Sequence, residues 1–303
     1  MHSLEGQVIA VTGATGFLGS HIARALLAAG ARVIGVVRSP EKGRWLAEQG
    51  VVFRKADLGD EASLATAFDG CNVVVANAAL ATKKRASLTS FREANVGGVE
   101  RTMGAVATAD VKRVVHISSV GVYQVRMGRL MDESTPVRER FRVDPSLLTT
   151  NWRYTLTKAQ GERVARVLAE ASGVDLTVFR PGPVHGSRDT KFLPKLVRRA
   201  QRSWAIVPSV GIPMVHAGDV ADAVVAALSN PVSRGRTYNL GGTTHPLPEV
   251  IRTVAEVLET KCRVVAVPLG MGVQFDDGAV KRDLGIQHRP LLDGLREALY
   301  TPS

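Results

Sequence analysis

The chain has 303 residues, of which 45% are hydrophobic, 22% charged and 5% aromatic, and its formal net charge is +11. This length can bury a sizeable core in one large or two modest domains. The basic residues come in short, scattered runs without interleaved aromatics, so we expect no nucleic-acid partner. No apolar run is long enough to cross a bilayer, and we expect no membrane partner. A basic chain instead suits an anionic cofactor or substrate.

The two cysteines and the N-terminus indicate where the protein works. Cys71 and Cys262 lie far apart, and neither has neighbours at the spacing of metal ligands. We therefore expect two reduced thiols and no metal site. The N-terminus enters the first predicted strand almost at once, so we expect no signal or transit peptide and a cytoplasmic protein.

The first predicted elements are a buried strand, a glycine turn and a helix. Val8–Thr12 is an apolar strand, Gly13, Gly16 and Gly19 follow at GxxGxxG spacing, and Phe17–Ala29 has a helical repeat. Such a unit binds the pyrophosphate of a dinucleotide, because glycines let the backbone approach the phosphates and the helix N-terminus is positive. A tight β–α turn that binds nothing has the same pattern, but the position directly after the first strand favours nucleotide binding.

The end of the second predicted strand, Arg32–Val37, indicates which dinucleotide binds. A site selective for NAD usually carries Asp or Glu about 20 residues after the glycines, whereas this chain has Arg38 there. The planar fork of an arginine pairs with phosphate oxygens. Arg38 therefore predicts NADP, assisted by Lys42 or Arg44. NAD is the alternative if Arg38 is only a solvated charge at the strand end.

Asp57 follows the third predicted strand, Val51–Arg54. At that place its carboxylate can accept a hydrogen bond from the adenine amino group. It can equally cap the N-terminus of the next helix.

The first half of the chain alternates strands with helices, which predicts an α/β fold with a doubly wound parallel sheet. The further strands are expected at Val73–Ala76, Arg113–Ile117 and Leu176–Phe179. The further helices are expected at Glu41–Gln49, Ser63–Phe68, Leu88–Thr108 and Trp152–Ser172.

After residue 180 this alternation stops, and five prolines up to Pro213 predict an irregular region with one helix, Phe192–Arg202. The later elements are expected at Asp219–Leu228 (helix), Thr237–Leu240 (strand), Leu247–Glu259 (helix), Arg263–Val267 (strand) and Leu291–Leu299 (helix). We therefore expect residues 1–180 to form a dinucleotide-binding domain and residues 181–303 a smaller substrate-binding lobe. The strand near 237–241 is expected to rejoin the first domain.

A tyrosine and a lysine on one helix point to redox chemistry at a carbonyl. Tyr154 and Lys158 are four residues apart and share a helix face. A tyrosine that exchanges a proton has an ordinary pKa of about 10, and a lysine about 4 Å away would lower it by at most about three units. At the end of the fifth strand, Ser119, with Ser118 beside it, can hydrogen-bond a substrate carbonyl. Alternatively, Tyr154 and Lys158 are surface residues, and the two serines cap the strand.

Six ordered motifs make the chain resemble the extended short-chain dehydrogenase/reductases, the NAD(P)-dependent epimerase/dehydratase family. They are Thr12–Gly19, Asp57-Leu58, Asn95-Val96, Ser118-Ser119 with Tyr123, Tyr154 with Lys158, and Arg180-Pro181 through Gly186. Later stretches also match, at 215–221, 238–242 and 283–285. The resemblance covers essentially the whole chain.

The resemblance implies a Rossmann domain and a Ser–Tyr–Lys site. Tyr154 would be the acid/base, Lys158 would hold the nicotinamide ribose, and Ser119 would orient the carbonyl. Asn95 would position the lysine through water. The cofactor-binding residues would be Gly13, Thr15, Gly16, Phe17, Leu18, Arg38, Asp57, Leu58, Asn77, Ala78, Ala79, Tyr154, Lys158, Pro181 and Val184, of which Pro181 and Val184 would line the nicotinamide.

The chain departs from the family pattern at four places. Gln124 stands where glycine usually follows the tyrosine, and His185 stands where tyrosine is usual. Gly218 replaces the first aspartate of its motif, and the stretch around Asn77 lacks the histidine of extended members. These departures affect substrate contacts rather than the Ser–Tyr–Lys set.

Two enzyme functions and one other remain open. The preferred one is an NADPH-dependent reductase acting on a small, fairly apolar carbonyl substrate, similar to the dihydroflavonol reductases and hydroxysteroid dehydrogenases. The second is a nucleotide-sugar epimerase or dehydratase that keeps NAD(P) bound and uses Arg234, Arg236 or Arg289 for the sugar diphosphate. The third is a cofactor-sensing protein without activity. The resemblance also implies a homodimer through the helices Leu88–Thr108 and Trp152–Ser172.

Overall fold

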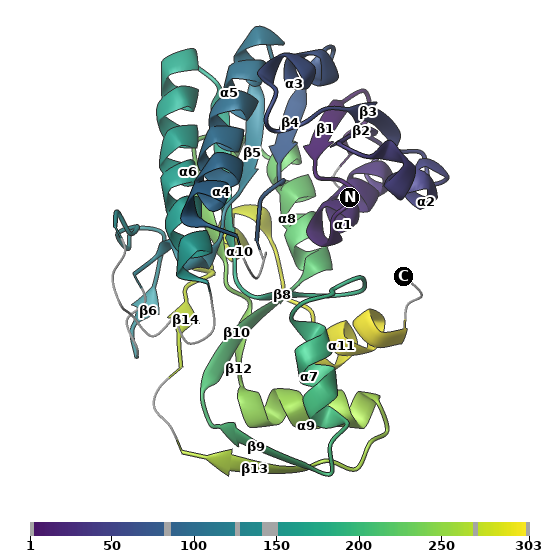
Figure 1. Cartoon of the computed structure of the whole chain (residues 1–303), viewed down its shortest axis with the longest axis vertical. Helices are drawn as coiled ribbons and strands as arrows, with labels where there is room; N and C mark the ends of the chain where they lie inside the picture. The colour runs from purple at the N-terminus through teal and green to yellow at the C-terminus, as the bar shows by residue number, and fades with distance from the viewer. Residues whose placement is uncertain (1–2, 82–85, 125–127, 141–150, 269–271, 301–303) are drawn as a thin grey trace.

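The computed structural model of the chain describes residues 3–81, 86–124, 128–140, 151–268 and 272–300. Its larger part is a seven-stranded sheet in the order β11-β7-β5-β4-β1-β2-β3, with every neighbouring pair parallel (Figure 1). The strands are β1 (Val8–Thr12), β2 (Arg32–Val37), β3 (Val52–Lys55), β4 (Val73–Ala76), β5 (Arg113–Ile117), β7 (Asp175–Pro181) and β11 (Thr237–Leu240). The predicted doubly wound sheet is confirmed.

Helices cover both faces of this sheet because its strands are apolar on both sides. Alternate residues of β1 belong to different cores: Ile9 and Val11 pack under α1 (Phe17–Ala28) and α8 (Ala217–Ser229), whereas Ala10 packs on the opposite face. That face is covered by α3 (Glu61–Phe68), α5 (Gly98–Thr108) and α6 (Trp152–Ser172), of which α5 and α6 run side by side (Figure 1).

The predicted helix Leu88–Thr108 is divided in the structure. It consists of α4 (Leu88–Arg92), a π-helical turn (Glu93–Gly97) and α5. The π-turn pushes the carbonyl of Asn95 toward α6, where a Cβ on Gly161 would lie only 2.2 Å from that oxygen. Helical periodicity cannot reveal such a turn, since its extra residue is stabilised by contacts with another helix.

The predicted helix Glu41–Gln49 is also shorter in the structure. It is a 3-10 turn (Pro40–Gly43) followed by one turn of α-helix, α2 (Arg44–Ala47). Two further 3-10 turns lie at Val120–Val122 and Pro231–Ser233, and helix α10 (Gly278–Leu284) packs near β11.

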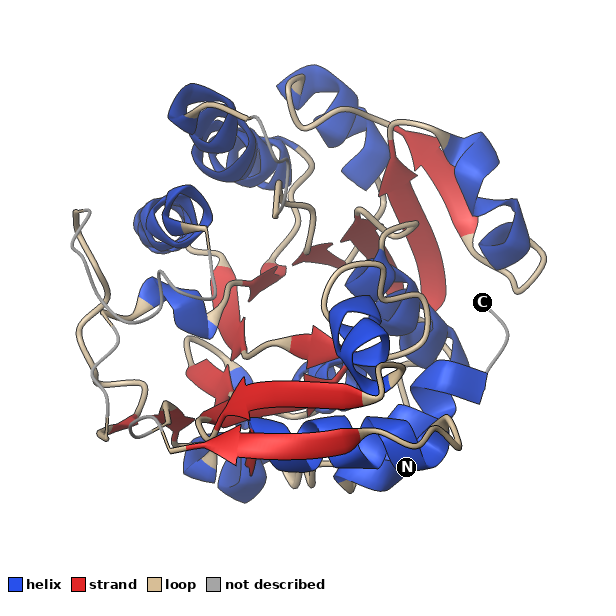
Figure 2. Ribbon diagram, turned by 60° about the horizontal axis from the view of Figure 1, so that its bottom comes forward, coloured by secondary structure: helices blue, strands red, loops and turns tan. Residues whose placement is uncertain are grey.

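The second lobe has its own apolar core between sheets and helices. A three-stranded sheet, β12-β10-β8, and a parallel pair, β13-β9, pack with helices α7 (Leu193–Ala200), α9 (Leu247–Val257) and α11 (Leu291–Tyr300). The strands are β8 (Val184–His185), β9 (Trp204–Pro208), β10 (Gly211–His216), β12 (Thr243–Pro246) and β13 (Arg263–Val267). The β9–β13 pair lies at the bottom of Figure 1 and comes to the front in Figure 2. A small pair, β6 (Leu130–Met131) and β14 (Gln274–Phe275), lies beside the large sheet.

The prediction of an irregular region after residue 180 is therefore wrong for three strands, β8, β9 and β10. Pro208 and Pro213 favour that prediction, yet both lie where a strand tolerates proline. Strand β8 pairs only with Val215 and His216, so β10 is an edge strand at Pro213. Pro208 is the last residue of β9. Proline is accepted at such edges and ends because no ladder hydrogen bond is required of it there.

Candidate active site

The carboxyl ends of the central strands open into a cleft of about 990 Å³, at the upper end of the range of about 300–1,000 Å³ for ligand pockets. The cleft lies where the strand order reverses between β1 and β4, which is where open α/β sheets bind ligands. All fifteen residues predicted to bind the cofactor contribute to its wall.

The glycine turn after β1 is shaped for close approach of a phosphate. Gly13 has φ +67, and a Cβ on Gly19 would lie 2.2 Å from the Gly13 carbonyl oxygen. The hydroxyl of Thr12 accepts hydrogen bonds from the backbone N–H groups of Asn77 and Ala78, both at 3.0 Å, and so ties the ends of β1 and β4 together.

Helix α1 begins at this turn with its N-terminus on the cleft. In the described chain no side chain caps that end, and its first turn carries no acidic residue. Gly16, Phe17 and Leu18 all line the cleft. Helical N–H groups without a side-chain acceptor favour an anion, so this geometry fits the pyrophosphate of a dinucleotide.

The part of the cleft beside β2 and β3 combines exposed cations with the carboxylate of Asp57. Arg38 and Lys42 line it, whereas Arg44 is not among its described lining residues. Asp57 also lines it and accepts the N–H of Gly59 at 2.8 Å. The alternative that Asp57 caps the next helix is wrong, because Asp60 is the N-cap of α3.

Arg101 is a cleft residue that the sequence did not indicate. Its guanidinium donates to the carbonyl oxygen of Leu58 and to the carboxylate of Glu93, each at 2.5 Å. Nothing in the sequence separates Arg101 from other helical arginines, because only the packing of α5 beside residue 58 brings it to the cleft.

Ser119, Tyr154 and Lys158 line the opposite end of the same cleft. The Ser119 hydroxyl accepts the N–H of Gly121 at 3.1 Å and lies near enough to the phenol of Tyr154 to exert a lowering effect on its pKa. The ammonium of Lys158 donates to the carbonyl oxygen of Ile117 at 2.7 Å. The structure therefore brings together the three residues that the sequence placed just after the fifth strand and on one face of α6.

The pKa of Tyr154 does not shift as expected from its spacing with Lys158. Burial raises this pKa above its ordinary value, and the Ser119 hydroxyl only opposes the rise. The expected lowering by Lys158 is wrong, since the ammonium is directed at the Ile117 carbonyl. Burial also lowers the pKa of Lys158 to about 8, against the opposing charge of Glu162.

Asn95 lies behind this group and is not among the described residues of the cleft wall. Its amide nitrogen donates to the hydroxyl of Thr157 at 3.0 Å and to the carbonyl oxygen of Leu80 at 3.1 Å. Its amide oxygen accepts the N–H of Leu80 at 2.7 Å. Asn95 thus reaches the residue next to Lys158, and connects it to the chain after β4.

A buried ion pair anchors α6, the helix that carries Tyr154 and Lys158, to strand β7. The carboxylate of Glu162 accepts two hydrogen bonds from Arg180, at 2.5 and 3.1 Å, and one from Ser118 at 2.6 Å. Burial would raise the pKa of Glu162, but Arg180 and Ser118 hold it at about 2. The Tyr123 hydroxyl accepts from Arg180 at 2.6 Å and donates to Asn239 at 2.8 Å. Ser118 and Tyr123 therefore belong to the scaffold of the site.

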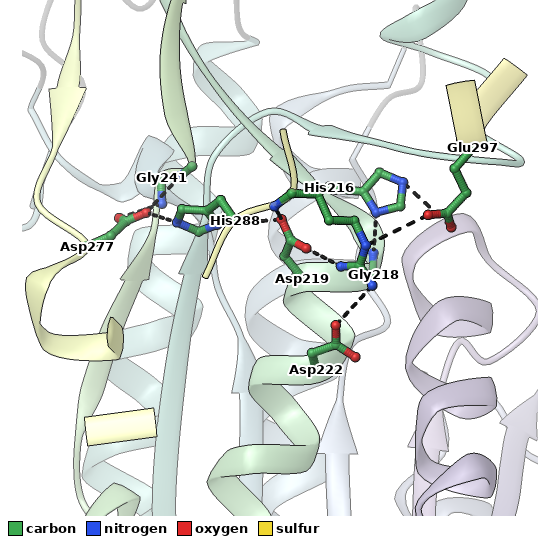
Figure 3. Close-up of polar contacts among 10 residues, drawn as sticks. His216, Gly218, Asp219, Asp222, Gly241, Asp277, His288 and Glu297 are labelled. Carbon is green, nitrogen blue, oxygen red and sulfur yellow. Dashed lines mark hydrogen bonds and ion pairs between the residues drawn. The ribbon is translucent and has the colours of Figure 1, made fainter. Parts of the chain in front are cut away.

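A second buried network holds the turn after β11 beside the cleft (Figure 3). The carboxylate of Asp277 accepts the N–H groups of Gly241 and Gly242, both at 2.9 Å, and pairs with His288 at 2.6 Å. The Gly241 carbonyl oxygen would lie 2.6 Å from a Cβ on Gly182, a residue of the cleft wall.

The arginines expected to bind a sugar diphosphate lie outside the cleft, and one of them belongs to this network. Arg289 pairs with Asp219, Asp222 and Glu297, three carboxylates that are labelled in Figure 3. Arg234 pairs with Asp175 at 3.2 Å. Of the described residues, the lining of the cleft includes none of Arg234, Arg236 and Arg289, so that expectation is wrong.

Two departures from the family pattern have a structural reason here. A Cβ on Gly218 would lie 2.9 Å from the guanidinium of Arg289, so glycine leaves room for that side chain. His185 is buried against His216, with ring centroids 5.3 Å apart, and burial lowers the pKa of each to about 4. For Gln124 the structure offers no explanation.

Comparisons with known proteins agree with this geometry. The model of the NAD dependent epimerase/dehydratase family matches residues 9–241. The chain is 30% identical to cinnamoyl-CoA reductase 1 of Petunia hybrida, over 99% of this chain and 93% of the relative. It is 28% identical to a 4-hydroxy-2-methyl-3-oxo-4-farnesyl-3,4-dihydroquinoline-1-oxide ketoreductase of Stigmatella aurantiaca, over 95% of each. A dTDP-glucose 4,6-dehydratase of Streptomyces venezuelae, a double mutant with NAD and DAU bound, superposes with a TM-score of 0.78 and 25% identity, covering 96% of this chain and 95% of its own.

The His288 network predicts a pH-dependent stability. Burial would lower the pKa of His288, yet Asp219 and Asp277 raise it to about 9. Because the folded pKa lies above the unfolded one, this stabilisation is complete below about pH 6.5 and is lost as the pH rises through about 9, with a total of about 3 kcal/mol. Chemical denaturation should show a smaller loss of unfolding free energy between pH 6 and 9.5 in His288→Gln than in the parent. Parallel curves for the two proteins would contradict the assignment of a charged His288.

Proposed function

Because the chain belongs to the NAD dependent epimerase/dehydratase family, we propose that it is an NADPH-dependent reductase of a carbonyl group on a small, fairly apolar molecule. It is an NAD(P)-dependent oxidoreductase of the extended short-chain dehydrogenase/reductase type. One observation carries the proposal: Ser119, Tyr154 and Lys158 lie on the wall of the same cleft into which the glycine turn opens.

The cleft wall suggests where each part of the dinucleotide would lie. The turn at Gly13 and the N-terminus of α1 would hold the pyrophosphate. Arg38 would pair with a 2′-phosphate and Asp57 would accept from the adenine amino group. The nicotinamide would lie against Pro181 and its neighbour Val184. The remaining cofactor contacts would come from Thr15, Gly16, Phe17, Leu18, Leu58, Asn77, Ala78, Ala79, Tyr154 and Lys158.

When bound, NADPH supplies the hydride, and the protein supplies the proton and the alignment. Ser119 would hydrogen-bond the carbonyl oxygen of the substrate. Tyr154 would donate its phenolic proton to this oxygen while the carbonyl carbon accepts the hydride, so that carbonyl, hydride and proton together give the alcohol. The raised pKa of Tyr154 suits this direction, since it keeps the phenol protonated at neutral pH.

Lys158 and Asn95 would act around this proton transfer. With a pKa of about 8, the ammonium of Lys158 is largely charged at neutral pH, and it would donate hydrogen bonds to the hydroxyls of the nicotinamide ribose beside Tyr154. Asn95 is proposed as a positioning residue, because its amide holds Thr157, the neighbour of Lys158, against the chain at Leu80.

The names of the relatives favour reduction over sugar-nucleotide chemistry. The two curated relatives are a reductase of a thioester and a ketoreductase of a farnesylated ring, and both match nearly the whole chain. The dehydratase shares the fold, but none of the three arginines on which that alternative depended is among the described residues of the cleft wall, and two of them, Arg234 and Arg289, are paired with carboxylates. Reduction of an apolar aldehyde, ketone or thioester is therefore the preferred function.

The proposal includes a homodimer in the cytoplasm. The helices α5 and α6 lie side by side on one face of the sheet, and Val167 of α6 is 58% exposed there. Cys71 and Cys262 are both free thiols, as is usual in a reducing compartment. None of the helices in the described part of the chain is long and apolar enough to cross a membrane.

The proton-donating role of Tyr154 predicts a large effect of removing one oxygen atom. Tyr154→Phe should lower kcat for carbonyl reduction by roughly 100- to 10,000-fold, while the Kd for NADPH stays within about twofold. The assay is NADPH consumption against a panel of aldehydes, ketones and acyl-CoA thioesters. Tyr300→Phe, at an exposed position on α11, is the matched control. Full turnover by Tyr154→Phe would overturn the mechanism.

The choice of NADPH depends on Arg38. Arg38→Gln should raise the Kd for NADPH by about tenfold or more, because a charged hydrogen bond to phosphate is worth about 1.5–3 kcal/mol. The Kd for NADH should change little, as measured by calorimetry. Arg44→Gln, an exposed arginine six residues further on, should leave both unchanged. If the parent protein preferred NADH, and Arg38→Gln kept that preference, the 2′-phosphate assignment would be wrong.

The dimer is tested by placing a charge on the exposed face of α6. Val167→Glu should shift the protein from dimer to monomer in light scattering after gel filtration, since a buried unpaired carboxylate weakens an interface strongly. Val232→Glu, on an exposed 3-10 turn elsewhere, should not change the mass. A parent protein that is monomeric at all concentrations would refute the dimer.

A further inference from the structure

Residues 186–192, which we term the crossing loop, connect β8 to α7 and bring the second lobe over the dinucleotide-binding half. Gly186 lies against helix α1, since a Cβ there would be 3.5 Å from the ring of Phe17. The carbonyl oxygen of Ser187 lies 2.9 Å from the Nε2 atom of His21, also on α1. The loop is thus attached beside the N-terminus of α1.

A second attachment lies near the adenosine end of the cleft. The guanidinium of Arg188 stacks on Trp45 of α2, 4.1 Å from the ring centroid. Arg188 takes a positive φ of 69, a conformation that costs free energy for a residue with a side chain and is kept only where contacts stabilise it. The crossing loop therefore spans the region between α1 and α2, where the phosphates of a dinucleotide would lie.

Asp189 fixes the backbone of this loop around Lys191. Its carboxylate accepts N–H groups from Lys191 at 2.7 Å, from Phe192 at 3.1 Å and from Leu193 at 2.7 Å. Leu193 is the first residue of α7, so the same carboxylate also serves that helix end. From this fixed backbone, the side chain of Lys191 lines the cleft.

The other cationic side chains of the cleft wall have another partner or another position. Among the described residues, the cleft wall contains Arg38, Lys42, Arg101, Lys158 and Lys191. Arg101 pairs with Glu93, and Lys158 donates to Ile117. Arg38 follows β2 directly and Lys42 lies in the 3-10 turn Pro40–Gly43, where we assign the 2′-phosphate.

The glycine turn itself offers the pyrophosphate no charged side chain. Residues 13–19 read GATGFLG and contain no lysine or arginine. A pyrophosphate carries two negative charges, which the N-terminus of α1 neutralises only in part. In the described part of the chain, Lys191 has no carboxylate partner of its own.

We propose that Lys191 binds the pyrophosphate of the dinucleotide, so that the second lobe contributes a direct cofactor contact. The crossing loop then places the pyrophosphate between the α1 N-terminus and a lysine from the other lobe. This contact is independent of the 2′-phosphate and so serves NADPH and NADH equally. The assignment rests on the proposed dinucleotide, but not on the substrate or on the reaction.

Calorimetry on the full chain with NADPH, NADH and ADP-ribose shows which anionic group Lys191 binds. Lys191→Gln should raise the Kd of all three by about tenfold, because all three carry the pyrophosphate. The increase should shrink at high salt, since it comes from charge. Lys195→Gln, an exposed lysine of α7 with the same change of charge, should alter none of the three.

Each other result overturns the assignment in its own way. A loss confined to NADPH would place Lys191 at the 2′-phosphate. Unchanged binding of all three ligands, with a raised KM for the carbonyl substrate, would place Lys191 at an anionic group of the substrate. A parent protein that binds none of the three would refute the proposed function together with this contact. Binding by the parent and by Lys191→Gln with equal Kd would refute this contact alone.

Discussion

The buried ion pair between Glu162 and Arg180 is the interaction on which the site depends most. Glu162 belongs to α6 and Arg180 to β7, and both are almost completely buried. Such a pair is stable only if its remaining hydrogen bonds are satisfied, and removing one partner typically costs about 3–5 kcal/mol. Here the Ser118 hydroxyl, just after β5, donates a further hydrogen bond to the carboxylate, and the Tyr123 hydroxyl accepts one from the guanidinium. Lys158 and Tyr154 lie one and two turns before Glu162 on α6. The Glu162–Arg180 ion pair therefore fixes the position of these two side chains relative to the sheet.

The environment of Tyr154 and Lys158 is more informative than their spacing. A four-residue spacing permits close contact, and from it alone a lowered tyrosine pKa is the natural expectation. In the fold, burial acts on both groups and disfavours the charged form of each, so the pKa of Tyr154 rises and that of Lys158 falls to about 8. The two shifts favour a protonated phenol beside an ammonium at neutral pH. That combination suits proton donation to a carbonyl oxygen, which is the reductive direction.

The second lobe is joined to the cleft by two polar connections of different character. One is the charged network of Asp277 and His288, which holds the turn at Gly241 against Gly182. The other is the crossing loop, attached to α1 through Ser187 and to α2 through Arg188. Both contact the cleft wall, the first at Gly182 and the second at Phe17. Asp219, which also pairs with His288, binds Arg289, and this removes a cation that a nucleotide-sugar substrate would have needed.

Much of the sheet and of the dinucleotide half follows from the sequence, because those features are local. Six predicted strands, at residues 8–12, 32–37, 73–76, 113–117, 237–240 and 263–267, have the predicted bounds, since apolar runs and glycine turns report on the chain immediately around them. Most residues predicted to contact the cofactor follow strands of the large sheet directly, and they line one cleft because parallel strands end at the same edge of the sheet. The π-turn at Asn95, the cleft position of Arg101 and the strands containing Pro208 and Pro213 escaped prediction. Each depends on a partner distant in sequence. The π-turn packs on α6, Arg101 contacts the chain after β3, and the two strands pair with β13 and β12. The sequence by itself determined which side chains are available for hydride chemistry, whereas tertiary packing decided which are buried, which are paired and therefore which can act.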